Sequence, residues 1–361
     1  MIKVIGTIGP ASINLNTLKN LKSKGLNSFR INLSHSNREL LDYYYEQFKI
    51  ADVEPSLDTQ GAQVRISFLK RKQYNTIDEK ISIGYYDLVD GQSAKYIDIG
   101  LTHKQFFDQI DDGDEIKIGF DGLIVKVSSV DKVQSILFAK VVNVGEIDLN
   151  KAVDISRKSL QLPAFTSFDL ECISESLRHG IKEIYVSFCG SSKCITQVKN
   201  MLREAGWSED NLPKIIAKIE NRQGLLDLEN IVEEADGILI DRGDLSREIK
   251  ISMIPGIVNK VIKTCVTRDT PCYVATNVLD SMMVSKLPSR AEISDIYNLL
   301  SFGISGFVLA AEVAIGSHPV ESVEVVRYMS SVFFDQKFQA GIIPSTQEVI
   351  PDIKEPLLSW L

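Results

Sequence analysis

Two groups of charged residues have the types and spacing that a metal-assisted reaction on an anionic substrate requires. Lys218 and Glu220 are two positions apart in the segment AKIEN, and Asp244 follows a glycine in the segment RGDL. Residues two apart on a strand point to the same side. Carboxylates suit Mg²⁺, which keeps further positions for water and substrate oxygens. Lys218 and Arg30 would then supply positive charge for a phosphate group. Taken singly, each of these residues is equally compatible with a solvated loop position or a structural ion pair.

The elements that would position these residues alternate between short strands and helices. Residues 3–8, 27–33 and 55–58 predict strands, and a further strand-like series follows residue 155 as IYVSF, KIIAKI, GILID, CYVAT and GFVLA. Helix-like stretches follow the strands, which is typical of parallel βα units. Eight such units predict an α/β protein with a closed (β/α)8, or TIM, barrel. An open doubly wound sheet is the alternative, but no GxGxxG follows the first strand.

Residues 66–150 interrupt this alternation with short, β-branched segments and turn signals such as DDGD. They predict a small β-barrel lid inserted after the third strand. We therefore expect four regions along the chain. These are the first part of the barrel (1–65), the lid (66–150), the second part of the barrel (151–336) and a C-terminal tail (337–361).

In a barrel of this kind the working residues follow the strands at their C-terminal ends. Reading those ends in order gives a rim rich in ionic and polar side chains. Several such residues on one rim favour a functional site over unrelated surface charges. The residues at these strand ends include Thr7, Arg30, Asn32, Ser34, His35, Asp58, Thr59, Gln60, Ser187, Lys218, Glu220, Asn221, Asp241, Arg242, Gly243, Asp244, Thr276 and Glu312.

The overall composition narrows the possible functions. The 361 residues carry 40 basic and 48 acidic side chains, a net charge of −8, so a nucleic-acid partner is not expected. No apolar stretch is long enough to span a membrane, and the N-terminal segment does not read as a signal peptide. The five cysteines are odd in number and lack CxxC spacing, which favours reduced thiols. We expect a cytoplasmic protein without a membrane partner.

Seven ordered motifs give the chain a specific resemblance. Over roughly residues 1–335 it resembles the pyruvate kinase family, which implies a barrel with an inserted lid. The implied reaction transfers the phosphoryl group of phosphoenolpyruvate to a nucleoside diphosphate, giving pyruvate and a nucleoside triphosphate. The motifs are TIGPAS (7–12), RINLSHS (30–36), LDTQG (57–61), AKIEN (217–221), RGDL (242–245), VATNVLDSM (274–282) and SRAEISD (289–295).

The resemblance implies roles for the metal and phosphoryl residues. Lys218 is similar to the lysine that stabilises the phosphoryl group in flight, and Arg30 to an arginine that contacts it. Glu220 and Asp244 resemble the ligands of the divalent cation, Mg²⁺ or Mn²⁺.

It also implies a cradle for the substrate carboxylate, formed by Thr276 and the backbone of Gly243 and Asp244. Thr276 would take part in proton transfer to the enolate carbon, and we expect Ser187 among the substrate-binding residues. On the nucleotide side, the matching residues are His35, Arg65 and Lys151. A monovalent cation, K⁺, would lie at Asn32, Ser34, Asp58 and Thr59.

The chain departs from the family pattern in several places. After the eighth strand, the family's Ser-Gly-Glu-Thr-Ala-Lys-Gly is replaced, with changes at Ala310, Ala311, Val313 and Ile315. This removes a serine linked to enolate protonation and a lysine near the nucleotide. Gln63 replaces a glutamate that bears on K⁺ dependence, and Asp241 stands where the family usually has an alanine.

These departures leave three functional hypotheses open. The chain could be a compact pyruvate kinase, a diverged metal-dependent enolpyruvate enzyme with another acceptor or a lyase-type reaction, or a non-catalytic relative. The retained Lys218, Glu220, Asp244 and Thr276 favour phosphoryl transfer. We expect no counterpart of the family's C-terminal regulatory domain, and a homo-oligomer, either a dimer or a tetramer.

Overall fold

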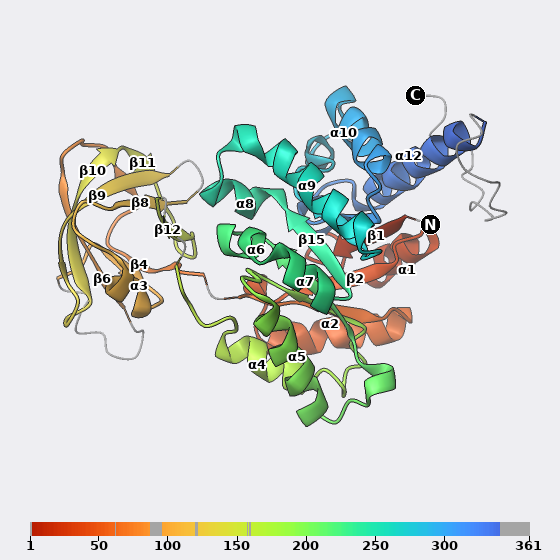
Figure 1. Cartoon of the computed structure of the whole chain (residues 1–361), viewed down its shortest axis with the longest axis horizontal. Helices are drawn as coiled ribbons and strands as arrows, with labels where there is room; N and C mark the ends of the chain where they lie inside the picture. Colours follow the sequence, from red (N-terminus) through yellow and green to blue (C-terminus); the bar gives the residue numbers. More distant parts are fainter. Residues whose placement is uncertain are drawn as a thin grey trace.

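The protein consists of an α/β barrel and a smaller β domain beside it (Figure 1). The computed structural model describes residues 2–339 except 62, 87–95, 120–121, 157 and 159. Most of the predicted tail, from residue 340 onwards, therefore lies outside the described residues. Within the described part of the chain, no helix has the length and apolar character needed to cross a membrane.

Eight strands close the predicted barrel, in the order β1-β17-β16-β15-β14-β13-β3-β2. Every neighbouring pair is parallel, as βα units require. The third and fourth barrel strands, β3 and β13, are neighbours although the lid separates them in sequence. The strands are β1 (Lys3–Thr7), β2 (Ser28–Asn32), β3 (Pro55–Asp58), β13 (Glu183–Val186), β14 (Lys214–Ile219), β15 (Gly237–Asp241), β16 (Cys272–Ala275) and β17 (Gly306–Leu309).

Helices cover the outside of this barrel, and side-chain caps fix where several of them begin. Ser289 and Glu292, for example, form a reciprocal capping box at the start of α10. The helices are α1 (Leu15–Ser23), α2 (Arg38–Ala51), α4 (Ser167–Ser174), α5 (Ser192–Glu204), α6 (Arg222–Leu226), α7 (Leu228–Glu234), α8 (Arg242–Glu248), α9 (Ile254–Thr267), α10 (Arg290–Ser301), α11 (Ala311–Ala314) and α12 (Pro319–Gln339). Short 3₁₀ turns are η1 (Leu33–His35), η3 (Glu209–Asn211), η4 (Ile251–Met253) and η5 (Asp280–Met283).

The inserted domain is a seven-stranded sheet in the order β12-β8-β9-β10-β6-β7-β4, with a short β5-β11 pair. A bridge between Arg65 and Ala152 brings its two edges together, so the sheet is nearly closed. The predicted lid boundary at residue 150 stays a prediction, but β12 pairs with β8 and so groups with the lid strands. The elements are β4 (Ile66–Leu69), β5 (Gln73–Tyr74), β6 (Lys80–Tyr85), β7 (Ile99–Leu101), α3 (Gln105–Gln109), β8 (Glu115–Ile118), β9 (Leu123–Asp131), β10 (Ile136–Asn143), β11 (Gly145–Glu146) and β12 (Val153–Ile155).

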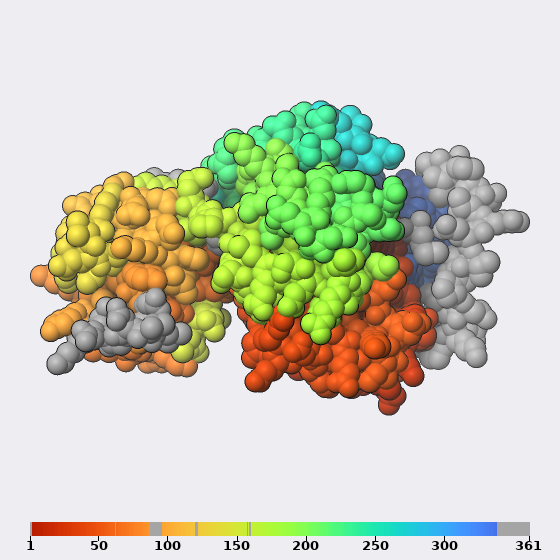
Figure 2. Space-filling model, turned by 90° about the horizontal axis from the view of Figure 1, so that it is seen from below, coloured from red at the N-terminus to blue at the C-terminus, as the bar shows by residue number. Residues whose placement is uncertain are grey.

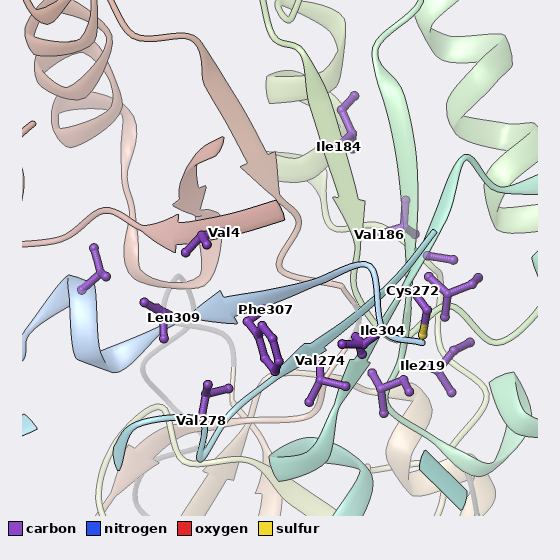
Figure 3. Packing of buried hydrophobic residues seen from close by; sticks show 14 of the residues in the cluster. Val4, Ile184, Val186, Ile219, Cys272, Val274, Val278, Ile304, Phe307 and Leu309 are labelled. Atoms are coloured by element: carbon purple, nitrogen blue, oxygen red, sulfur yellow. The ribbon is translucent and has the colours of Figure 1, made fainter. Parts of the chain in front are cut away.

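Separate apolar cores stabilise the two domains. The largest lies between the barrel strands and the helices, where Val274 and Phe307 from the neighbouring strands β16 and β17 lie side by side (Figure 3). A smaller cluster that includes Tyr185 and Leu239 fills the inside of the barrel. The lid has a core of its own. The charged rim residues therefore stand on a packed and rigid base.

The molecule is narrower where the lid meets the barrel, as the space-filling view shows (Figure 2). An ion pair crosses between the two domains, from Arg247 on α8 to Asp154 on β12. The side chain of Arg247 is largely buried, at 10% exposure, so this contact is shielded from solvent. It joins the lid to the helix that also carries Asp244.

Candidate active site

Three carboxylates converge where β14 and β15 end. Glu220 directly follows β14, Asp241 is the last residue of β15, and Asp244 lies in the first turn of α8. One carboxylate oxygen from each lies within 4.8 Å of the others. Strands β14 and β15 are parallel neighbours, so their C-terminal ends bring these side chains to one point.

Burial and mutual repulsion make this cluster electrostatically unfavourable without a cation. Burial raises the pKa of Glu220, and the negative charges of Asp244 and Asp241 raise it further against the opposing effect of Lys218. Burial and Asp241 also raise the pKa of Asp244. The Oε1 atom of Glu220 is buried and makes no hydrogen bond within the described residues. The ion-pair partner of this oxygen is the ammonium group of Lys218, and three crowded, buried carboxylates fit a divalent cation with oxygen ligands, such as Mg²⁺.

Lys218 is buried beside this cluster. Its Nζ atom lies 2.9 Å from Glu220 Oε1 and 3.0 Å from Asp58 Oδ1, and it donates a hydrogen bond of 2.9 Å to Ser187 Oγ. Burial disfavours the charge, but Asp58 and Glu220 outweigh it and raise the pKa of Lys218 above its usual value. The ammonium group is therefore fixed and stays protonated at neutral pH.

Arg30 on β2 brings a second cation to the same end of the barrel. Its guanidinium donates to Thr7 Oγ1 at 3.0 Å from Nε and at 2.5 Å from Nη2. Its Nη1 atom lies 3.1 Å from Asp58 Oδ2 in a buried ion pair. Asp58 therefore lies between the charges of Arg30 and Lys218 and links them across the mouth of the barrel.

The carboxylate of Glu220 is also held from the β13 side. Phe188 donates its backbone N–H to Glu220 Oε2 at 2.7 Å. Phe188 has a φ of 50°, a left-handed conformation that is uncommon outside glycine. This strained backbone turns the N–H towards the carboxylate, which is the kind of arrangement that functional sites retain.

Thr276, which follows β16, lies next to the amides of Gly243 and Asp244. Gly243 donates its N–H to Thr276 Oγ1 at 2.8 Å. Thr276 has a φ of 65°, again in the left-handed region. Arg242 stabilises this conformation, because its Nη2 atom donates to the Thr276 carbonyl at 2.7 Å while Nη1 pairs with Asp295.

The predicted monovalent-cation residues also gather at this end of the barrel. Asn32 and Asp58 are register partners on β2 and β3. Asn32 Oδ1 accepts a hydrogen bond from the Ser34 backbone, and Thr59 Oγ1 accepts one from the Ser187 backbone. Asn32, Asp58 and Thr59 are thus already engaged by protein donors and cations, so a monovalent ion would have to share these oxygens.

Two of the predicted nucleotide residues, Arg65 and Lys151, lie next to each other at the edge of the lid. Charges of Arg65 and Asp58 act on His35, whose pKa is lowered chiefly by burial. Burial also lowers the pKa of Arg65, although the charge of Asp244 counteracts it, and Arg65 Nη1 donates a hydrogen bond of 2.8 Å to the Asn150 carbonyl. Lys151 is exposed beside Arg65, and its carbonyl accepts a hydrogen bond from the Ile66 backbone.

A small cavity of about 80 Å³ lies between lid and barrel. Its lining includes Asp154 of the lid and Phe188, Asn221 and Glu248 of the barrel. Ligand pockets usually measure about 300–1,000 Å³, so this cavity is too small for a nucleotide, and His35, Arg65 and Lys151 are not among the residues that line it.

The altered loop after β17 forms the short helix α11. Ala310 precedes this helix, and no side-chain cap bonds its first turn. Val313 is buried, Ala311 is partly buried, and Ile315 is exposed at 63%. The loop thus presents an apolar side chain to solvent where the family resemblance implies a lysine.

Sequence reasoning did not assign roles to three residues that the structure brings into the site. Thr7 accepts from Arg30, and Arg242 holds the backbone of Thr276. Asp241 was given no role beyond being a departure from the family, yet its carboxylate lies in the central cluster. Their positions at strand ends were the available signal, since Thr7 ends β1 and Asp241 ends β15.

The fold and site define a (β/α)8-barrel protein whose rim combines clustered carboxylates with two buried cations. The family described as "Pyruvate kinase, barrel domain" matches residues 1–323. The chain therefore belongs to the pyruvate kinase family.

Individual relatives agree with this assignment. The chain is 31% identical over 338 residues to a pyruvate kinase of Lactobacillus delbrueckii subsp. bulgaricus, covering 90% of this chain and 55% of the relative. It is 32% identical over 337 residues to a pyruvate kinase of Geobacillus stearothermophilus, covering 91% and 56%. A pyruvate kinase of Agrobacterium vitis is 29% identical over 369 residues, with 98% and 72% covered. The chain thus spans just over half the length of several curated relatives.

Proposed function

We propose that this protein is a phosphotransferase that moves the phosphoryl group of phosphoenolpyruvate to a nucleoside diphosphate. Pyruvate and a nucleoside triphosphate are the products. The relatives are named pyruvate kinase, which supports this reaction class. Because the chain spans only part of those relatives, its own activity is a proposal rather than a property taken from them.

The observation that carries the proposal is the position of Lys218. Its ammonium group is buried, held by Asp58, Glu220 and Ser187, and adjacent to the carboxylate cluster. In phosphoryl transfer, negative charge is spread over the oxygens of the transferred group in the transition state. An enzyme accelerates this reaction mainly by placing fixed positive charges beside those oxygens. Arg30 would add a second fixed cation on the other side of Asp58.

Glu220 and Asp244 would hold Mg²⁺ or Mn²⁺, with Asp241 close by. When bound, this cation would neutralise charge on the substrate oxygens. A bound K⁺ at Asn32, Ser34, Asp58 and Thr59 is part of the same proposal. K⁺ would share the Asp58 carboxylate with Arg30 and Lys218, which already supply positive charge to it.

The remaining residues would orient the substrate and handle its proton. The N–H groups of Gly243 and Asp244 and the hydroxyl of Thr276 are hydrogen-bond donors suited to a carboxylate. After the bond between phosphorus and the enol oxygen breaks, the enolate carbon must gain a proton to give pyruvate. Thr276 would take part in this transfer, and its hydroxyl lies 2.6 Å from the Ala275 carbonyl.

The nucleoside diphosphate would enter between barrel and lid. His35 and Arg65 would lie beside it, and closure of the lid over the bound nucleotide would exclude water. A cytoplasmic location, a homo-oligomeric state and the absence of nucleic-acid and membrane partners remain parts of this proposal.

One observation favours the second candidate, a diverged enolpyruvate enzyme with a different acceptor. Ile315 is exposed at the rim where a nucleotide-binding lysine is implied, and Ala310 replaces the serine linked to protonation. Both changes affect the acceptor and proton-donor side, whereas Lys218, Glu220 and Asp244 are retained.

The test is an assay of pyruvate formation from phosphoenolpyruvate and Mg²⁺ with a panel of nucleoside diphosphates, with and without K⁺. The proposal predicts pyruvate formation that requires both Mg²⁺ and a nucleoside diphosphate. Phosphoenolpyruvate consumption that is independent of every diphosphate would favour the second candidate. The absence of any turnover, together with normal phosphoenolpyruvate binding, would favour a non-catalytic protein.

A further inference from the structure

The side chain of Asp241 lies among the very donors that a substrate carboxylate would need. Its Oδ1 atom is 3.2 Å from the Gly243 nitrogen, 3.4 Å from the Asp244 nitrogen and 3.2 Å from Thr276 Oγ1. Asp241 is buried, with 7% of its surface exposed. The amides of Gly243 and Asp244 and the hydroxyl of Thr276 thus already contact a carboxylate of the protein itself, that of Asp241.

These contacts are long and partly shared. Gly243 also donates to Thr276 Oγ1 at 2.8 Å, and the Thr276 hydroxyl lies 2.6 Å from the Ala275 carbonyl. Distances of 3.2–3.4 Å are at the long end for hydrogen bonds, and longer than the 2.7–2.9 Å typical of charge-assisted ones. The contacts to Gly243 and Asp244 cap the N-terminus of α8, and a ligand with a better-placed carboxylate would have to take over that role.

The charge of Asp241 adds a second obstacle. Its carboxylate lies within 4.8 Å of the ligand oxygens of Glu220 and Asp244, so the region holds three acidic groups before any substrate arrives. A substrate carboxylate entering beside it would meet like-charge repulsion in a poorly solvated site. Asp241 therefore weakens binding of the substrate carboxylate in two ways. It occupies the hydrogen-bond donors, and its negative charge repels the incoming carboxylate.

We propose that Asp241 is a specificity-determining residue whose carboxylate competes with the substrate carboxylate for the amides of Gly243 and Asp244 and the hydroxyl of Thr276. The inference rests on the proposed function, because it assumes that phosphoenolpyruvate binds at this site. It accounts for one departure from the family pattern in physical terms. The native protein binds phosphoenolpyruvate more weakly than the same site would with a small apolar residue at position 241.

The experiment compares the wild-type protein with Asp241→Ala and Asp241→Asn, by calorimetric titration of phosphoenolpyruvate with Mg²⁺ present and nucleotide absent. Asparagine keeps an oxygen that can accept hydrogen bonds from the same amides but carries no charge. Comparing the two variants therefore separates the effect of charge repulsion from the effect of occupied hydrogen-bond donors. Inorganic phosphate, titrated in the same way, carries charge but no carboxylate. Asp236→Ala, just before the other end of β15, is the matched control.

Asp241→Ala is expected to bind phosphoenolpyruvate about tenfold or more tightly than wild type, since at least one charge-assisted contact is freed for the ligand. Asp241→Asn should gain less than Asp241→Ala. The affinity for inorganic phosphate should rise less than that for phosphoenolpyruvate, and Asp236→Ala should match wild type. Unfolding curves of both Asp241 variants in Mg²⁺-free buffer establish that they are folded.

Two results would overturn the inference while leaving the proposed function intact. One is wild-type binding of phosphoenolpyruvate that neither Asp241 variant improves. The other is a loss of Mg²⁺ affinity in Asp241→Ala, which would identify Asp241 as a metal ligand instead of a competitor. If wild type and both variants all fail to bind phosphoenolpyruvate with Mg²⁺, the proposed function itself fails, and the inference with it.

Discussion

Lys218 and Asp58 form an ion pair of 3.0 Å between strands β14 and β3, which are separated in the barrel by β13. Both side chains are almost fully buried. Asp58 comes from the part of the barrel before the lid and Lys218 from the part after it. Asp58 can therefore hold the ammonium group of Lys218 in place only when both parts of the barrel have assembled.

Lys218→Met should reduce turnover far more than substrate binding. A fixed cation that stabilises charge developing on the phosphoryl group acts mainly in the transition state. We expect kcat to fall by roughly two to four orders of magnitude with a much smaller change in KM. Steady-state kinetics check this, with Lys214→Met at the exposed start of β14 as the control. A large rise in KM with kcat intact would assign Lys218 to ground-state binding.

Removal of a metal-binding carboxylate should abolish stabilisation by Mg²⁺. A cation that binds only the folded protein at 100 times its Kd stabilises it by about 2.7 kcal/mol, which raises Tm. Glu220→Gln and Asp244→Asn should lose this Mg²⁺-dependent rise in thermal denaturation, whereas Asp236→Asn should retain it. An equal Mg²⁺ effect in all four proteins, wild type included, would show that the cation binds elsewhere.

Restoring polar residues in the loop after β17 should strengthen nucleotide binding. The double variant Ala310→Ser with Ile315→Lys returns a hydroxyl and a cation to the rim, and Ile315 is exposed enough to accept a lysine without repacking. One charge-assisted contact is worth about 1.5–3 kcal/mol, or roughly 10- to 150-fold in affinity. We expect a lower KM for the nucleoside diphosphate and faster pyruvate formation.

Ile315→Gln serves as the neutral control for that double variant. It restores polarity at the same position without a charge, so it should give little of the gain. No gain in the double variant, combined with no turnover of any nucleoside diphosphate in either protein, would make the diverged enzyme the leading hypothesis.

Glu183 at the start of β13 should make the stability of the barrel depend on pH. Burial disfavours its charge, but Lys3 and hydrogen bonds from Tyr185 and Ser28 outweigh this and lower the pKa of Glu183. A lowered pKa in the folded state gives stability that is present above the unfolded value of about 4.5 and lost as pH falls through the folded value. Glu183→Gln should therefore cost about 1–3 kcal/mol at pH 7 and much less at pH 3.

Urea unfolding of wild type and Glu183→Gln between pH 3 and pH 7 measures this difference. Glu54→Gln is the matched control, because Glu54 pairs with Lys182 on the exposed surface. Such a pair is worth at most about 1 kcal/mol. A Glu183→Gln deficit that stays constant over the whole pH range would contradict the assigned pKa shift.

Much of the fold followed from periodicity, because parallel strands of a barrel are buried on both faces and read as short apolar runs. The barrel strands were predictable for this reason, whereas the inserted domain was predictable from its short β-branched segments and turn signals, and the rim from the polar residues that follow the barrel strands. The sequence could not reveal that β12 pairs with the lid strand β8, since pairing between strands distant in sequence depends on the closing geometry of the sheet.

The contacts within the site were less predictable than its residues. Lys218, Glu220 and Asp244 could be named from type and spacing, but the link from Lys218 to Asp58 arises only when the barrel closes. Asp241 shows the same limit. An acidic residue after a strand is ordinary in a sequence, and only its distances to the amides of Gly243 and Asp244 indicate competition with a substrate.

The central claim is that this site transfers a phosphoryl group from phosphoenolpyruvate to a nucleoside diphosphate. A single-turnover experiment with phosphoenolpyruvate labelled at phosphorus tests it most directly, with excess wild-type or Lys218→Met protein, Mg²⁺ and a nucleoside diphosphate. The account predicts that wild type moves the label into the terminal phosphate of the nucleotide, with one pyruvate formed per label moved, and that Lys218→Met does so at least about a hundredfold more slowly. Label that remains in phosphoenolpyruvate, or appears only as inorganic phosphate, with wild-type protein would contradict the account.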